Sequence, residues 1–195
     1  MAKKQFKAES KRLLDLMINS IYTNKEIFLR EIISNAIDKL CYLSLTDDKV
    51  GLNRSDYKIE IIPDKEKRTL TVRDNGIGMT AEECENNLGV IARSGSYKFK
   101  DEMDSEKGQA EDISVGFYSA FMVADEVTVI TRKYGEEQGV MWKSTGADGY
   151  TVTPCDKDTV GTDVIMHIKP DTDDEIYGSY LEVWKIKALV KKYSD

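Results

Sequence analysis

Glu31 and Asn35 are the first pair of residues whose types and spacing could do chemistry. Residues four apart share one face of an α-helix. A carboxylate there can orient a water molecule for attack, and an amide oxygen can help to hold Mg²⁺. Spacing alone favours an exposed polar stripe over a functional pair. A semi-buried cleft is favoured by the apolar character of the same stretch, which carries Ile27, Phe28, Ile32 and Ile33.

A second group follows a predicted strand, where residues 74–79 read DNGIGM. Asp74 at a strand end can accept a hydrogen bond from a base amino group, and the two glycines let a ligand approach the backbone closely. An ordinary turn is the alternative for D-x-G-x-G. Residues 76–81 also fit G-x-G-x-x-A, but the parallel strand and acidic residue that a dinucleotide fold needs about 20 positions later are replaced by a highly charged stretch.

The elements that must position these residues alternate between helical and strand periodicity. Helical spacing covers residues 9–45 with a break near 23–24. Residues 57–62 and 69–73 alternate as strands do and predict a hairpin. Thr80 can cap a short helix that ends near Leu88. We expect a lid or loop at 89–115. Further elements are a buried helix at 116–124, strands near 126–132, 138–144, 150–153 and 161–168, and a final helix at 175–192.

This order predicts an α+β fold, a two-layer sandwich of helices on a mixed, mostly antiparallel sheet. No linker interrupts the 195 residues, so we expect one domain, 1–195. The net charge of −7 disfavours nonspecific nucleic-acid binding. One histidine, His167, leaves little room for histidine acid–base chemistry or zinc.

The three cysteines are far apart in sequence, which predicts reduced, mostly buried thiols of a cytoplasmic protein. No stretch is apolar enough for a signal peptide or a membrane span, so we expect no membrane partner.

Five longer motifs carry a family resemblance. They are residues 19–36 (NSIYTNKEIFLREIISNA), 74–79 (DNGIGM), 87–95 (NLGVIARSG), 115–121 (VGFYSAF) and 160–162 (VGT). In this order they resemble the amino-terminal ATP-binding domain of the 90-kilodalton heat-shock protein chaperones, bacterial HtpG type. The resemblance covers essentially the whole chain and implies the ATPase fold shared with gyrase B, MutL and histidine kinases.

The resemblance implies an ATP-dependent chaperone domain that assists protein folding and binds ATP or ADP with Mg²⁺. Its partners would be client proteins and the protein's own middle domain, which supplies an arginine for hydrolysis. The middle and carboxy-terminal domains of the family are absent from these 195 residues. We therefore expect the isolated domain to be a monomer with weak or no ATPase activity, and the full-length protein to be a homodimer.

The same motifs assign roles to individual site residues. By resemblance, Glu31 is the general base, Asn35 the Mg²⁺ ligand and Asp74 the acceptor for the adenine amino group. Other residues would surround the nucleotide: Gly78 and Met79 at the base, Asn87 and Arg93 near the ribose and phosphates, Gly116 and Phe117 as lid backbone, and Thr162 completing the adenine site.

Two departures from the family pattern affect this site. The family reads S-N-A-S-D-A-[L/I]-D-K-[L/I], whereas Ala36 is followed at once by residues 37–40, IDKL. Either Asp38 replaces the first aspartate of the family pattern or three residues are missing, and we favour the deletion. The loss of three helical residues rotates the rest of the helix by about 60°, so the apolar residues that follow would no longer face the core. Of the three glycines in the lid pattern G-Q-F-G-V-G-F, only one remains here, as Gly116. We therefore expect weakened adenine binding and very slow hydrolysis. The alternative is a non-hydrolysing nucleotide- or inhibitor-binding module.

Overall fold

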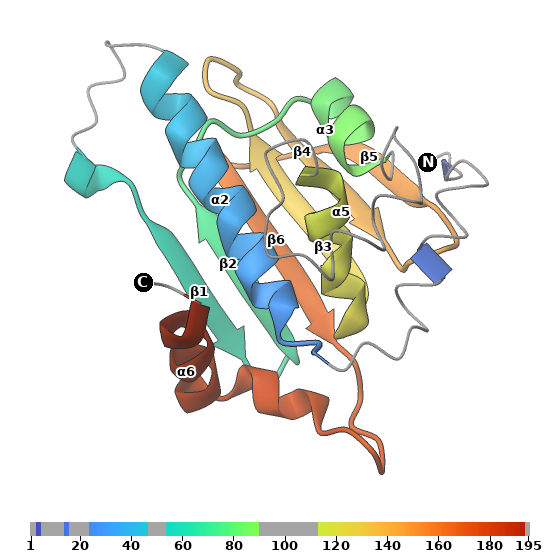
Figure 1. Cartoon of the computed structure of the whole chain (residues 1–195). Helices are drawn as coiled ribbons and strands as arrows, with labels where there is room; N and C mark the ends of the chain where they lie inside the picture. The colour runs from blue at the N-terminus through green and yellow to red at the C-terminus, as the bar shows by residue number, and fades with distance from the viewer. Residues whose placement is uncertain (1–2, 5–13, 16–23, 47–53, 90–112, 194–195) are drawn as a thin grey trace.

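The computed structural model describes residues 3–4, 14–15, 24–46, 54–89 and 113–193. Its helices are α2 (Ile27–Thr46), η1 (Arg54–Asp56), α3 (Ala81–Leu88), α5 (Ile113–Tyr118), η2 (Ser119–Met122), η3 (Tyr177–Leu181) and α6 (Val183–Tyr193). Its strands are β1 (Ile59–Asp64), β2 (Thr69–Asp74), β3 (Ala124–Arg132), β4 (Gly139–Ser144), β5 (Tyr150–Cys155) and β6 (Gly161–Ile168). Figure 1 shows their arrangement.

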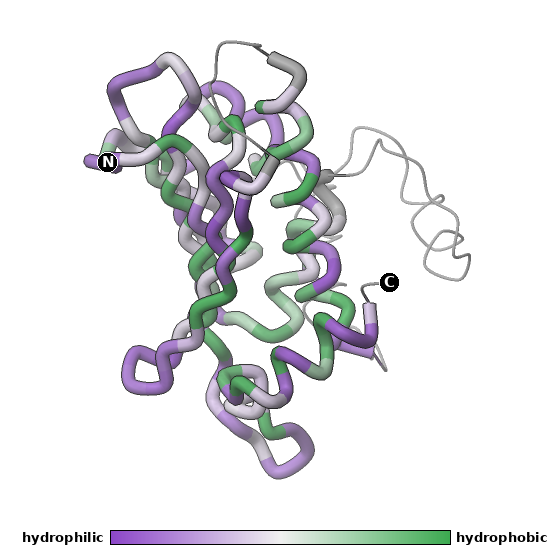
Figure 2. Tube along the Cα trace, turned by 90° about the vertical axis from the view of Figure 1, so that its left-hand side faces the viewer, coloured by the Kyte–Doolittle hydropathy of each residue, from purple (hydrophilic) through white to green (hydrophobic). Residues whose placement is uncertain are grey.

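The strands form one six-stranded sheet in the order β1-β2-β6-β3-β4-β5. Every strand pair in the described part of the chain is antiparallel, so the parallel component of the expected mixed sheet is absent from that part. Seen from the side, the strands form one layer and the helices the other (Figure 2). The predicted α+β two-layer sandwich is confirmed.

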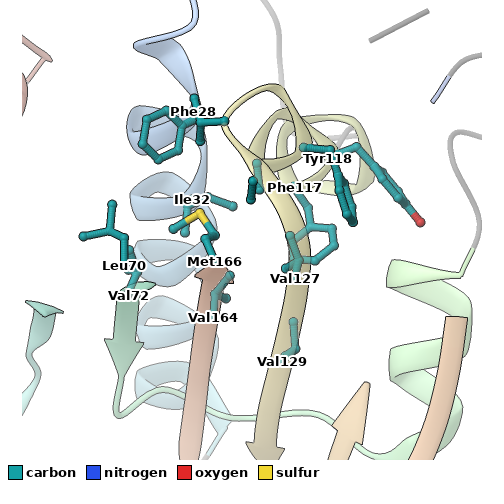
Figure 3. Close-up of a cluster of buried hydrophobic side chains, with 14 of the residues drawn as sticks. Phe28, Ile32, Leu70, Val72, Phe117, Tyr118, Val127, Val129, Val164 and Met166 are labelled. Atoms are coloured by element: carbon teal, nitrogen blue, oxygen red, sulfur yellow. The ribbon is translucent and has the colours of Figure 1, made fainter. Parts of the chain in front are cut away.

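The core lies between α2 and the sheet because the strands alternate in burial. Along β2, for example, Leu70 and Val72 are buried while Thr71 between them stays partly exposed. Figure 3 shows how side chains from α2 and α5 meet those of β2, β6 and β3 in this layer. Burying large apolar side chains in this way stabilises the fold by roughly 1.5–3 kcal/mol each.

The local predictions agree with most elements. The hairpin is present as β1 and β2, and Pro63 lies on the edge strand β1, where its missing N–H costs nothing. Thr80 caps α3, and it forms a capping box with Glu83. The expected final helix is interrupted at Glu182, whose extended backbone separates η3 from α6. The expected helix before residue 24 and nearly all of the predicted lid lie outside the described residues.

The cysteine expectation is wrong in part, since Cys84 is buried but Cys155 is partly exposed and Cys41 is exposed. None of the helices in the described ranges is long and apolar enough to span a membrane.

Candidate functional site

A cavity of about 360 Å³ lies between the middle of α2 and the end of the sheet. That volume falls in the range of about 300–1,000 Å³ that is typical of small-molecule sites. Helix α2, the loop after β2, and helix α3 form most of its wall. The lining residues are Ile32, Asn35, Ala36, Asp38, Lys39, Tyr42, Val72, Asp74, Ile77, Gly78, Met79, Glu83, Asn87, Leu88, Phe117, Val129, Lys133 and Val164.

The floor of the cavity comes from three neighbouring strands. Val72, Val164 and Val129 are register partners on β2, β6 and β3, so they point to the same side of the sheet. Figure 3 shows Val72, Val164 and Val129 on three neighbouring strands, with Val129 the farthest from α2. An apolar floor of this kind suits the face of a flat aromatic ring.

Asp74 is the polar group at the end of that floor. Its side chain is only 3% exposed, and its Oδ1 accepts a hydrogen bond of 2.9 Å from the Gly76 amide. Burial raises the pKa of this carboxyl above its ordinary value, while the charge of Lys39 and the Gly76 hydrogen bond oppose that rise. A buried carboxylate with one oxygen engaged by its own loop can offer the other to a ligand donor.

Next to Asp74, two threonines continue the same row across the sheet. Asp74 pairs with Thr162 in register, and Thr162 pairs with Thr131. Both threonines are fully buried, and their Oγ1 atoms are 3.0 Å apart. The Thr131 hydroxyl also accepts a 2.9 Å hydrogen bond from the amide of Met79. This row therefore ties the end of the sheet to the loop that forms one wall of the cavity.

Replacing Thr131 with valine should destabilise the protein by about 1–3 kcal/mol, because the buried Met79 amide loses its acceptor while the side-chain volume stays the same. Urea unfolding measures the difference. Thr128→Val is the matched control, since Thr128 lies on the same strand but is only partly buried, and it should shift stability by less than about 0.5 kcal/mol. Equal effects of the two changes would contradict a specific role for the Thr131 hydroxyl.

Gly78 shapes the same loop by its backbone. Its φ is +69°, and a Cβ at this position would lie 1.9 Å from the carbonyl oxygen of Arg132. The close approach holds the loop against the end of β3, which places Met79 in the cavity wall.

Gly78→Ala should therefore cost about 3 kcal/mol or more, because the strand or the loop must move. Gly135→Ala separates clash from dihedral strain, since Gly135 has a φ of +87° but nothing within 4 Å of an added Cβ. That control should cost about 1–2 kcal/mol. Chemical denaturation of both variants makes the comparison, and a loss at Gly78 no greater than at Gly135 would rule out the steric explanation.

Asn35 and Glu31 occupy successive turns of α2 but different surroundings. Asn35 lines the cavity and is partly buried. Glu31 is not among the lining residues; its Oε1 accepts hydrogen bonds from Arg30 Nε at 2.9 Å and from an Arg30 terminal nitrogen at 2.7 Å. Its Oε2 lies 2.8 Å from the position that a Cβ on Gly116 would take. Glu31 thus lies where α2 meets α5, one turn beyond the cavity.

Helix α3 closes the opposite wall with Asn87 and Leu88. Glu83 fixes its orientation, because one carboxylate oxygen accepts from the Thr80 amide and the other bonds the Lys133 ammonium at 2.7 Å. Glu83 and Lys133 both border the cavity, so this ion pair joins α3 to the end of β3 at the edge of the site.

Comparison with known proteins agrees with this arrangement. Residues 22–162 match the family described as "Histidine kinase-, DNA gyrase B-, and HSP90-like ATPase". The chain belongs to this ATPase family. The matched stretch holds every cavity-lining residue except Val164.

Curated relatives within the ATPase family are named "Chaperone protein HtpG". Those of Alkaliphilus oremlandii, Bacillus subtilis and Clostridium acetobutylicum are 59%, 57% and 57% identical to this chain. Each comparison covers all of this chain but 32% of the relative, so the chain spans about a third of the length of these proteins. The comparisons run over 200 positions against 195 residues here, a difference of five.

Of the residues that the ATPase resemblance assigned to the site, the structure gathers six in the wall of one cavity: Asn35, Asp74, Gly78, Met79, Asn87 and Phe117. Thr162 lies under it and reaches the wall through Thr131. Glu31 and Gly116 contact each other beside it. Arg93 lies outside the described residues.

The residues around the cavity of this ATPase domain that the sequence analysis did not assign to the site include Lys39, Lys133 and, behind its wall, Thr131. Thr131 could have been found as a strand position opposite Thr162, but that required the register of two strands 30 residues apart. The sequence does not indicate that Lys39 lies at the cavity, because the face of α2 on which it lies depends on how the helix is rotated after Ala36. Two apolar residues beyond that point, Ile37 and Tyr42, are 48% and 55% exposed, as expected if the helix is turned there.

Proposed function

We propose that this chain is the nucleotide-binding domain of an ATP-dependent chaperone and that the cavity beneath α2 holds the adenine of ATP or ADP. The observation that carries the proposal is the buried Asp74 carboxylate at the end of an apolar floor. Its Oδ1 is held by the Gly76 amide, which leaves the other oxygen for the adenine amino group. The valines on β2, β6 and β3 would contact the ring face.

Asn35 has the right chemistry for the Mg²⁺ ligand. It offers an amide oxygen at the cavity wall, and Mg²⁺ in nucleotide sites takes few protein ligands because phosphate and water supply the rest. When bound, the ion would offset the negative charge of the phosphates. Glu31 would accept a proton from the water that attacks the terminal phosphate, and the absence of a side chain at Gly116 leaves room for its carboxylate beside α5.

The proposed domain extends over residues 1–195, with a lid at about 89–115, and we expect it to act in the cytoplasm as part of a longer chain. The relatives' name supports action on client proteins. Dimerisation and contact with a middle domain would belong to the full-length protein, and the isolated domain would be a monomer.

Two measurements on the isolated domain test the proposal. Calorimetry with ADP and Mg²⁺ should show one site per chain with weaker affinity than an intact family domain shows, and single-turnover assays with ATP should show slow hydrolysis. A thermal shift with ADP but no turnover would instead support the non-hydrolysing binding module. If ADP causes no thermal shift and ATP is not turned over, the proposal of a nucleotide site is contradicted. Binding as tight as that of an intact family domain would contradict the predicted effect of the two altered segments.

A further inference from the structure

Lys39 is the one cationic side chain on α2 that lines the cavity, and it faces the loop that carries Asp74. Its backbone carbonyl accepts a 3.1 Å hydrogen bond from the Ile77 amide, which pins the loop to the helix at this residue. Ile77 in turn accepts a bond from the Tyr134 amide beyond the end of β3. The backbone of Lys39 is therefore fixed against the loop after β2, and that loop is in turn bonded to the residues that follow β3.

The lysine and the aspartate flank Gly76. The Lys39 Cβ and the Asp74 Oδ1 lie 2.8 and 2.9 Å from the place where a Cβ on Gly76 would be. Lys39 Cβ and Asp74 Oδ1 are therefore no farther apart than those two distances together, and a lysine stem can span that separation. Among the described residues, no hydrogen bond or ion pair engages the Lys39 ammonium, although the charge of Asp74 acts on it.

Lys39 is partly exposed, and its charge loses part of its hydration at the cavity wall. Burial lowers the pKa of Lys39 below its ordinary value, and the negative charge of Asp74 opposes that effect. For Asp74, burial raises the pKa and the positive charge of Lys39 lowers it. A ligand that accepts a hydrogen bond from Lys39 and donates one to Asp74 would satisfy both groups at once.

The edge of adenine has this pattern, because the donor 6-amino group lies next to the acceptor ring nitrogen N1. We propose that Asp74 and Lys39 form a complementary acceptor–donor pair that reads the 6-amino group and N1 of adenine, so that Lys39 is a specificity-determining residue of the base pocket. The inference rests on the proposed nucleotide site and adds a direct side-chain contact to N1.

The test compares ADP with 1-deaza-ADP, in which N1 is replaced by C–H, on the complete 195-residue chain. Calorimetry should show that wild type binds 1-deaza-ADP about tenfold or more weakly than ADP, the loss expected for one hydrogen bond from a charged donor. Lys39→Met should bind ADP with about the same reduced affinity, and should no longer distinguish the two ligands. Lys39→Gln keeps a shorter donor and should fall between the two proteins.

Lys191→Met serves as the matched control, because Lys191 is exposed in the last turn of α6 and should leave both affinities unchanged. Thermal unfolding without ligand verifies that each variant is folded. If wild type binds ADP and 1-deaza-ADP equally, the role of Lys39 is overturned while the nucleotide site stands. Tighter ADP binding by Lys39→Met would also overturn it, since the lysine would then be an obstacle. If neither wild type nor Lys39→Met binds ADP, the proposed function itself fails.

Discussion

Replacing Glu31 with alanine should leave ADP affinity unchanged and reduce the residual ATP turnover of this domain by about 10²–10⁴-fold, the usual contribution of a positioned base. The structure supports this separation of effects. Glu31 lies one turn from Asn35 on α2, but it is not among the residues that line the cavity. Its carboxylate is held by Arg30 on one oxygen and lies beside Gly116 on the other.

Single-turnover hydrolysis and ADP calorimetry on the same preparation measure the two effects. Glu31→Gln is the stricter variant, because it keeps the side-chain volume beside Gly116 and an oxygen for Arg30 but cannot take up the proton. It should match the alanine variant in turnover. Loss of ADP binding in Glu31→Gln would show that the carboxylate has a binding role, and unchanged turnover in both variants would exclude it as the base.

The second large effect is expected at the base end of the cavity. Asp74→Asn should weaken ADP binding by about 100-fold or more, because a charged acceptor is lost and the new amide group can present a donor to the adenine amino group. The asparagine oxygen can still accept from the Gly76 amide, so the loop should keep its conformation. Removing the Asp74 charge ends its own desolvation cost but leaves Lys39 without a favourable negative charge, so some loss of stability is expected beside the larger loss of binding.

Calorimetry measures the binding loss, and urea unfolding without ligand shows whether the fold is intact. Asp173→Asn makes the same chemical change at an exposed position and should alter neither quantity. ADP affinity of Asp74→Asn within about threefold of wild type, a difference below 1 kcal/mol, would remove Asp74 from the proposed site.

The sequence by itself determined the features that depend on local spacing. The alternation of residues 57–62 and 69–73 predicted the β1–β2 hairpin, and Thr80 predicted the start of α3. Motif resemblance pointed to six of the residues that line the cavity. The hairpin and the start of α3 were predictable because hydrophobic periodicity and capping act over a few residues that are close together in the chain, whereas the roles of the six cavity residues stay predictions.

The tertiary structure alone decided which distant side chains meet. Thr131 lies beside Thr162 only because β3 and β6 pair in one register, and a slip of one residue would turn Thr131 to the other face. Lys39 comes beside Asp74 because the Ile77 amide bonds its carbonyl and Gly76 leaves space between them. Neither contact leaves a pattern along the chain, because strand register and helix rotation are set by packing between elements that are far apart in sequence.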